Sequence, residues 1–294
     1  MRVLIIGGTS FIGRYFIKYT KIKKVFPTSS KNKKNFIKFN LLTDNVGFII
    51  EKYKISHVIF LSAFSRPQDC EKNKKLSNNL NVISTKGVLN ILLKKNIYFI
   101  FISSDYIFDG NKGNYSENSI PNPKVLYGKQ KLKIEKFLKN SINRNFAILR
   151  CPKICGVNLD DRSIFMNFLS DCLKKKKMFK LANDQIFSPL YVKDLIKIFD
   201  IVLEEKIKGK FNVSGDENLS RFKFIKKIIE KFNLKKINLV SRSLSELSDV
   251  KNVPLNVSLN NSKIKKKINF KFTNFSKYLE ILRRKYEKKI QEIQ

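Results

Sequence analysis

Short apolar runs alternate with longer amphipathic stretches over the first 150 residues. The apolar runs are rich in Ile, Val and Phe and largely uninterrupted, as buried parallel strands tend to be. They predict strands at residues 3–6, 24–27, 36–39, 58–62, 98–103 and 146–150. The stretches between them predict helices at residues 12–19, 46–53, 75–95 and 127–140. Strands that alternate with helices imply right-handed crossovers, and therefore a doubly wound parallel sheet of the α/β class.

Beyond residue 150 the pattern becomes mainly helical. It predicts helices at residues 163–177, 192–204, 222–232 and 278–293, a short strand at 210–213 and mostly loop at 241–262. The first of these helices ends in the basic run 174–177, which reads as a solvated end. We expect a dinucleotide-binding Rossmann domain at 1–155, completed by about 186–206, and a smaller C-terminal α/β lobe at 156–294. The cleft between the two should bind the substrate.

Composition excludes a disordered chain, because 43% of the residues are hydrophobic and 12% are aromatic. The formal charge of +36 raises the question of a nucleic-acid or anionic-membrane partner. However, only ten of the 60 basic residues are Arg, and the Lys excess runs along the whole chain with abundant Asn and Ile. This distribution is typical of coding bias, so we expect no specific nucleic-acid partner and no membrane partner. The positive electrostatic field of the chain should still attract anionic substrates.

The four cysteines, Cys70, Cys151, Cys155 and Cys172, do not form a disulfide pattern for a chain of 294 residues. The single histidine, His57, stands in an apolar run and fits a strand start better than a metal ligand, so we expect no metal. The N-terminus opens on an apolar strand and a glycine turn rather than a signal peptide. No apolar run approaches the ~20 residues needed to span a bilayer. We therefore expect a cytoplasmic protein; the sequence leaves a homodimer open.

The first 14 residues form a strand, a turn of small residues and a helix start. Glycines at 7, 8 and 13 let a phosphate approach the backbone N–H groups, and the positive end of the helix dipole favours it. Ser10 replaces the middle glycine of the usual spacing, so an ordinary strand-to-helix turn is the alternative. The position at the chain start favours dinucleotide binding by Gly7, Thr9, Ser10, Phe11, Ile12 and Gly13.

The second strand indicates which dinucleotide is bound. An acidic residue after this strand usually holds the adenine ribose of NAD, and the first acidic residue in the chain is Asp44. Ser29, Ser30 and Lys31 follow the strand instead. Hydroxyl and ammonium groups suit the 2′-phosphate of NADP, so we expect NADP(H) to be preferred over NAD(H).

Tyr127 and Lys131 lie four residues apart, which places a phenol and an ammonium on one face of a helix. A phenol with a pKa of about 10 is a weak acid at neutral pH. A neighbouring cation should lower that pKa toward the range in which proton transfer is efficient. A chance match is easy in a lysine-rich chain, but this pair follows a glycine turn and stands about twenty residues beyond Ser104.

Several stretches resemble the dTDP-4-dehydrorhamnose reductases, an extended branch of the short-chain dehydrogenase/reductases. The most specific is Ile-Ser-Ser-Asp-Tyr-Ile-Phe-Asp-Gly at 102–110, followed by Tyr-Gly-Lys-Gln-Lys-Leu-Lys-Ile-Glu at 127–135. Further similarities lie at residues 62–64, 69–71, 81–82, 115–117, 121–123, 184–195, 209–215 and 254–259. The resemblance covers residues 1 to about 275.

The resemblance implies an NADPH-dependent reductase of a nucleotide-linked 4-keto-6-deoxy sugar. Tyr127 would donate the proton to the sugar carbonyl oxygen, and Lys131 would lower its pKa and hold the nicotinamide ribose. Ser104 would hydrogen-bond the reacting oxygen, although a cap at the end of its strand is the alternative. Asp105 and Tyr106 would contact the sugar. Ser62 and Ala63, at the end of the fourth strand, would border the cofactor.

Two departures from the family pattern concern the substrate. Lys153 stands where these reductases commonly place a Trp against the sugar, and Asn212 stands where a His is usual. Lys153 is therefore expected to read a sugar that carries a further anionic or polar group; the alternative is that its stem lies along the wall and its charge points to water. Alternatives are an epimerase or dehydratase of the same fold, a non-catalytic subunit resembling the β subunit of methionine adenosyltransferase, suggested by Pro152, and, from charge alone, a nucleic-acid binder.

Overall fold

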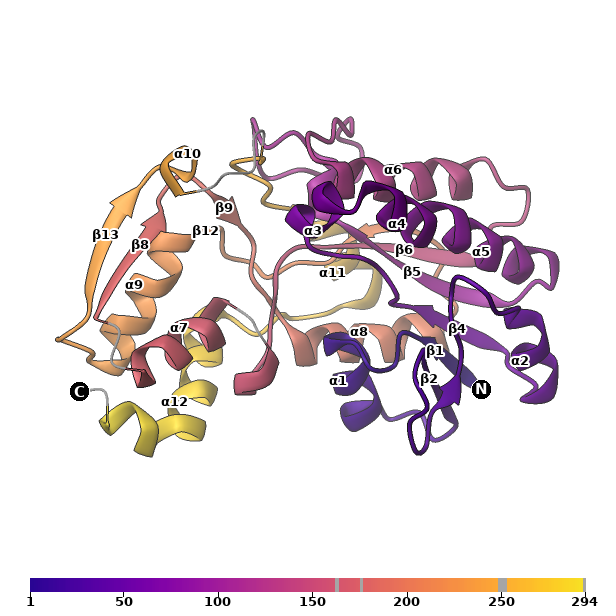
Figure 1. Ribbon diagram of the computed structural model, residues 1–294, viewed down its shortest axis with the longest axis horizontal. Helices are drawn as coiled ribbons and strands as arrows, with labels where there is room; N and C mark the ends of the chain where they lie inside the picture. Colours follow the sequence, from indigo (N-terminus) through magenta and orange to yellow (C-terminus); the bar gives the residue numbers. More distant parts are fainter. Residues whose placement is uncertain (162–163, 175–176, 248–252, 293–294) are drawn as a thin grey trace.

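The computed structural model describes residues 1–161, 164–174, 177–247 and 253–292 (Figure 1). Seven strands of these residues form one parallel sheet in the order β3-β2-β1-β4-β5-β6-β11. The strands are β1 (Val3–Ile6), β2 (Val25–Ser29), β3 (Ile37–Lys38), β4 (His57–Phe60), β5 (Tyr98–Ser104), β6 (Phe146–Cys151) and β11 (Gly209–Asn212). Strand order reverses between β1 and β4, so their carboxyl ends open a crevice at this switch point.

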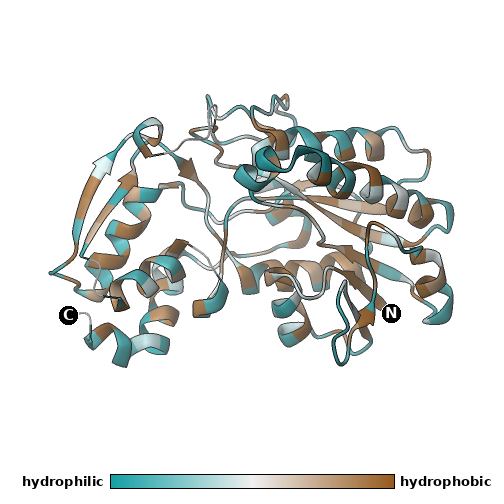
Figure 2. Cartoon of the chain, viewed as in Figure 1, coloured by the Kyte–Doolittle hydropathy of each residue, from teal (hydrophilic) through white to brown (hydrophobic). Residues whose placement is uncertain are grey.

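Helices cover both faces of the sheet. The helices in this part of the fold are α1 (Phe11–Tyr19), α2 (Val46–Lys52), α3 (Pro67–Lys72), α4 (Lys74–Asn78), α5 (Thr85–Lys94), α6 (Leu126–Lys139) and α8 (Val192–Glu204). Val3 and Ile5 share a buried cluster with Phe16 of α1 and with α8. Leu4 and Ile6 point the other way, into a cluster with α2, α5 and α6. Alternate residues of one strand therefore face opposite layers, and the central strands are largely hydrophobic (Figure 2).

A smaller lobe lies beside the sheet (Figure 1). Its longest strand pair is the parallel pair of β8 (Met178–Ala182) with β13 (Asn238–Arg242). Two shorter pairs are β7 (Ile154–Cys155) with β10 (Leu190–Tyr191), which is parallel, and β9 (Ile186–Phe187) with β12 (Leu219–Ser220), which is antiparallel. Its helices are η3 (Leu159–Asp161), α7 (Ile164–Leu173), α9 (Arg221–Phe232), α10 (Leu244–Leu247) and α12 (Phe275–Gln291), whereas α11 (Ser262–Ile268) packs against the edge strand β11 of the sheet.

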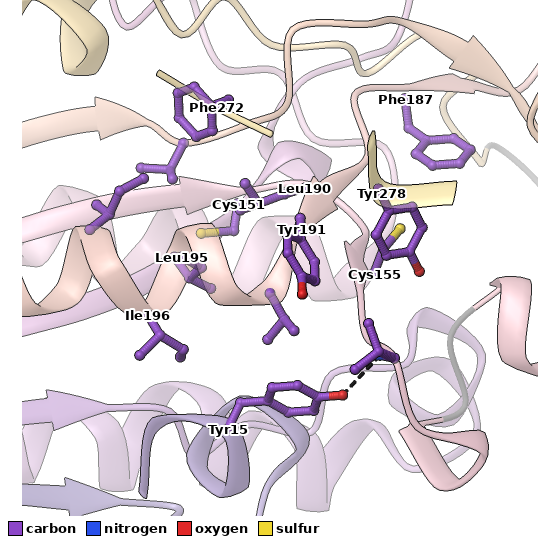
Figure 3. Packing of buried hydrophobic residues seen from close by; sticks show 14 of the residues in the cluster. Tyr15, Cys151, Cys155, Phe187, Leu190, Tyr191, Leu195, Ile196, Phe272 and Tyr278 are labelled. Carbon is purple, nitrogen blue, oxygen red and sulfur yellow. Dashed lines mark hydrogen bonds between the residues drawn. The ribbon is translucent and has the colours of Figure 1, made fainter. Parts of the chain in front are cut away.

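The two parts meet along the segment that follows β7. Val157 donates its N–H to the Tyr15 hydroxyl at 2.8 Å, drawn as the dashed line in Figure 3. The hydroxyl of Tyr278 donates to the carbonyl of Gly156 at 2.7 Å, and that of Tyr286 to the carbonyl of Val157 at 2.7 Å. Hydroxyls from α1 and α12 thus satisfy the backbone of this connection and hold the lobe against the sheet.

The expected fold class is confirmed, with differences inside it. The helix predicted at 75–95 is α4, the π-helical turn η1 (Asn79–Ser84) and α5. The helix α3, the short helix α11 and the small strand pairs of the lobe were not predicted, because short elements carry little periodic signal. The segment predicted as loop at 241–262 contains α10, and the last helix begins at Phe275. Of the predicted ranges 163–177 and 278–293, residues 163, 175–176 and 293 lie outside the described residues.

The single histidine and the four cysteines are all buried in the fold. His57 begins β4, where burial lowers its pKa to about 4. Among the described residues, no three of His, Cys, Asp and Glu lie together as metal ligands would. The helices in the described ranges are all too short or too polar to cross a bilayer.

Candidate active site

Two cavities open at the carboxyl ends of the strands. The first has a volume of about 290 Å³ and is lined by Ile6, Gly7, Thr9, Thr28, Ser29, Ser30, Phe39, Asn40, Leu41, Leu42, Ser62 and Leu80. The second, about 740 Å³, lies between the sheet and the lobe. Its lining includes Phe11, Ile12, Ser104, Asp105, Tyr106, Tyr127 and Lys153 among the predicted site residues. The end of β1 and the turn after it border the first cavity, and the start of α1 borders the second, so the two cavities flank the same glycine turn.

The glycine turn leaves room for a phosphate. Gly7 has a φ of +93°, and a Cβ there would lie 2.9 Å from the backbone nitrogen of Ser62. A Cβ on Gly13 would lie 2.6 Å from the carbonyl oxygen of Gly8, so only glycine lets α1 start this close to β1. Ser10 caps the helix by accepting a hydrogen bond from the N–H of Gly13 at 3.1 Å. Ser10, which stands where the middle glycine is usual, therefore serves as the N-cap of α1.

The residues expected at the 2′-phosphate are only partly gathered. Ser29 and Ser30 line the first cavity, at the end of β2. The side chain of Lys31 is exposed and is not among the groups that line either cavity, while its N–H donates to Ser29 Oγ at 3.2 Å. Ala63 likewise borders neither cavity, although its neighbour Ser62 lines the first.

Tyr127 and Lys131 lie on α6 as expected, one turn apart. The ammonium of Lys131 is 5.7 Å from the centre of the Tyr127 ring and 4.8 Å from that of Phe101. It donates to the carbonyl of Ile102 at 2.8 Å, and only 5% of the residue is exposed. The tyrosine ring faces the second cavity, whereas the lysine lies behind it.

The lowered pKa expected for Tyr127 is wrong for these protein surroundings. Burial raises the pKa of the Tyr127 phenol, the negative charge of Asp105 raises it further, and the Ser104 hydroxyl lowers it. Burial also lowers the pKa of Lys131, to about 8. The neighbouring cation expected from the spacing is thus itself poorly solvated, and desolvation outweighs its attraction for a phenolate.

Ser104 ends β5 and lines the second cavity. Its hydroxyl donates to Asp105 Oδ1 at 2.8 Å and accepts the N–H of Tyr106 at 3.2 Å, which is the capping contact considered as the alternative. A hydroxyl has one proton, so Ser104 would have to rotate away from Asp105 to donate to a substrate oxygen.

Asp105 is enclosed, with 4% of its surface exposed, and its Oδ2 has no hydrogen-bond partner among the described residues. Burial raises the pKa of this carboxyl to about 6, against the opposing charge of Lys153 and the hydrogen bond from Ser104. Ser103 Oγ and Asp161 Oδ1, from residues that line the same cavity, likewise lack a hydrogen-bond partner among the described residues.

Lys153 follows β6 and lies at the cavity wall. Its ammonium donates to the Tyr106 hydroxyl at 3.2 Å, and lies 5.2 Å from the centre of that ring and 5.6 Å from that of Phe187. Asn212, by contrast, does not reach the cavity. It is fully buried, and its amide donates to the carbonyl of Tyr115 at 2.7 Å. This departure from the family pattern therefore concerns packing, and the expectation that it bears on the sugar is wrong.

Sequence reasoning missed several groups of the second cavity. The polar ones are Arg66, Gln68, Asp161, Lys180, Gln185 and Arg221. Arg221 opens α9 and donates to the side chain of Gln185. Arginine is rare among the basic residues of this chain, and that rarity was the one sequence signal that could have singled out Arg221. Leu244, Leu247 and Val253 complete the wall from the segment predicted as loop.

The sheet order, the glycine turn at the switch point and the adjoining cleft define an NAD(P)-binding reductase/epimerase fold of Rossmann type. Comparison with known proteins gives the family. The RmlD substrate binding domain matches residues 1–287. The chain therefore belongs to this family, that of the dTDP-4-dehydrorhamnose reductases, as its motifs suggested.

Individual relatives point in two directions. A hypothetical dTDP-4-dehydrorhamnose reductase from Sulfolobus tokodaii is 25% identical, with a TM-score of 0.81 over 95% of this chain and 99% of that one. The Bacillus anthracis reductase, solved in complex with NADP, has a TM-score of 0.84 at 22% identity, over 97% and 99% of the two chains. The Xenopus laevis methionine adenosyltransferase 2 subunit beta is 30% identical over 243 residues, 79% of this chain and 72% of the relative.

Proposed function

We propose that the protein is an NADPH-dependent reductase of a nucleotide-linked 4-keto-6-deoxy sugar, in deoxysugar and polysaccharide biosynthesis. The observation that carries the proposal is the second cavity, which Tyr127 and Ser104 line at the carboxyl end of the sheet, with Lys131 buried behind Tyr127 and the glycine turn beside them. Four basic side chains, Arg66, Lys153, Lys180 and Arg221, line the same cavity, which suits the diphosphate of a sugar nucleotide.

The residues of the glycine turn fit a dinucleotide, because a side chain at Gly7 or Gly13 would fill the space that the phosphates need. When bound, NADPH supplies the hydride that reduces the carbonyl carbon. Tyr127 would protonate the carbonyl oxygen from its hydroxyl, and a raised pKa keeps that proton on the phenol until charge develops on the oxygen. The Ser104 hydroxyl would hydrogen-bond the same oxygen. Lys131, held by the carbonyl of Ile102, would stabilise the phenolate that remains.

Replacement of Tyr127 by Phe tests this function. We expect turnover of NADPH with a dTDP-4-keto-6-deoxy sugar to fall by at least ~10²-fold, the scale of losing a positioned general acid. The affinity for NADPH, measured by fluorescence titration, should change little, because the removed hydroxyl acts mainly in the transition state. Tyr98→Phe is the matched control, since its hydroxyl lies at the other end of β5 and bonds only to backbone carbonyls of Val202 and Ile207. Absence of turnover with every nucleotide-linked 4-keto sugar, in protein that binds NADPH, would sink the proposal.

The preference for NADPH over NADH is a second part of the proposal. Ser29 and Ser30 line the first cavity, and Lys31 is the nearest cation along the chain. We expect tighter binding of NADPH, and Lys31→Glu should erase or reverse the preference by placing a carboxylate near a phosphate. Lys54→Glu is a matched control that makes the same charge change away from both cavities. Equal affinities of the unmodified protein for both cofactors would mean that the loop after β2 does not read the phosphate.

A regulatory subunit is the second candidate, because of the likeness to the methionine adenosyltransferase β subunits. It predicts a stable complex with a methionine adenosyltransferase catalytic subunit in size-exclusion chromatography, unaffected by Tyr127→Phe. The reductase proposal predicts that the protein reduces its substrate without such a partner. An epimerase or dehydratase of the same fold would leave the total amount of NADPH unchanged while altering the sugar, so product analysis separates it from a reductase.

A further inference from the structure

A buried chain of hydrogen bonds joins the helix of Tyr127 and Lys131 to the loop after β4. It starts in the π-helical turn η1, where Asn81 accepts the N–H of Phe64 at 2.8 Å and donates to the carbonyl of Phe64 at 2.9 Å. The same amide donates to Gln130 Oε1 at 2.7 Å, and Gln130 Nε2 donates to Ser77 Oγ at 3.0 Å. Ser77 in turn donates to the carbonyl of Lys74 at 3.1 Å.

The members of this chain are closed off from water. Asn81, Gln130 and Ser77 are 4%, 1% and 0% exposed. Both amides have partners on their oxygen and their nitrogen, so neither can turn over without leaving a buried polar group unsatisfied. A fully satisfied buried network of this kind holds the elements that it joins in one arrangement.

The place of Gln130 suggests what is held. It lies on α6 between Tyr127 and Lys131, the two groups of the proposed proton transfer. At the other end of the chain, Phe64 belongs to the loop that supplies Ser62 to the first cavity and Ser65 to the second. The π-helical turn shifts the register of its helix at Asn81, and such turns are common at functional sites.

We propose that Gln130 is a positioning residue, which through Asn81 sets the distance between the loop after β4 and the helix of Tyr127 and Lys131. The inference rests on the proposed reductase function, in which the carbonyl group must contact Tyr127 and the cofactor at once. Misplacement by about 1 Å can cost ~10²-fold in rate. The helix keeps other attachments, since Glu71 accepts the N–H of Leu126 at 3.0 Å, so loss of Gln130 loosens this geometry without detaching α6.

The test compares Gln130→Met, which keeps the shape and removes both hydrogen bonds, with Tyr98→Phe, which removes a buried hydroxyl remote from the cavities. In Gln130→Met we expect kcat about tenfold lower with KM within about threefold of the parent. Hydrogen exchange of the amides in residues 61–68 should be about tenfold faster. Tyr98→Phe should lower Tm and leave kcat and this exchange unchanged. Ser77→Ala removes one hydrogen bond of the same network. It should lower kcat and speed the exchange at residues 61–68, each by less than Gln130→Met does.

Two results would overturn the inference. One is parental kcat and exchange in Gln130→Met despite a lower Tm, because a residue that only packs changes stability alone. The other concerns the case in which Gln130→Met does not fold. Hydrogen exchange at residues 61–68 that is as slow in Ser77→Ala as in the parent would then reject the inference. If the unmodified protein reduces no sugar nucleotide, the reductase proposal fails, and the exchange measurement still decides whether Gln130 holds the loop.

Discussion

Asp105→Asn should alter the pH dependence of stability in a direction set by the buried carboxyl. Burial raises the pKa of Asp105 to about 6 from 3.8, so the folded protein holds this proton more tightly than the unfolded chain does. The stabilisation from the protonated Asp105 carboxyl is complete below its pKa in the unfolded chain. It is lost as the pH rises through its pKa in the folded protein. A shift of this size corresponds to about 3 kcal/mol, since each pH unit is worth about 1.4 kcal/mol.

Guanidinium unfolding of parent and variant at about pH 4.5 and about pH 7.5 measures the effect. Asparagine does not titrate, so the stability of Asp105→Asn relative to the parent should rise by about 2 kcal/mol between these pH values. Asp44→Asn is the control of opposite sign, because backbone and side-chain hydrogen bonds lower the pKa of that exposed carboxyl. Its stabilisation is present at high pH and is lost on acidification. A relative stability of Asp105→Asn that stays constant across the range would refute the reasoning.

The other predictions concern Lys153 and the buried ion pair behind α6. Lys153→Met should change kcat/KM by about tenfold for keto-sugar nucleotides that carry an added anionic or polar group, the scale of one lost charge-assisted hydrogen bond; unchanged values over the whole panel would mean that Lys153 does not read the substrate. Glu135→Ala should cost about 3–5 kcal/mol in urea unfolding, because the Arg150 guanidinium, 0% exposed and 2.6 Å from Glu135, loses its partner. Glu230→Ala breaks an exposed pair and should cost under about 1 kcal/mol; similar losses in the two variants would contradict this.

The fold class could be read from the sequence because its signals are local or periodic. Uninterrupted apolar runs mark strands covered on both faces, and the glycines at 7 and 13 mark a turn where a Cβ would collide with neighbouring backbone. The spacing of Tyr127 and Lys131 likewise needs only the pitch of a helix. Those predicted residues that line the two cavities come together because the carboxyl ends of parallel strands share an edge.

The electrostatics and the rest of the cavity wall were decided by tertiary structure. The pKa of Tyr127 depends on how many protein atoms surround the phenol, which the spacing to Lys131 does not contain. Lys153 meets Tyr106, 47 residues away, and Gln130 meets Asn81, 49 residues away. Such contacts arise only when separate elements pack, so the sequence determined which groups are present and at which strand ends they lie. Packing decided which of them are desolvated, which are already hydrogen-bonded and which, like Asp105 Oδ2, still lack a partner among the described residues.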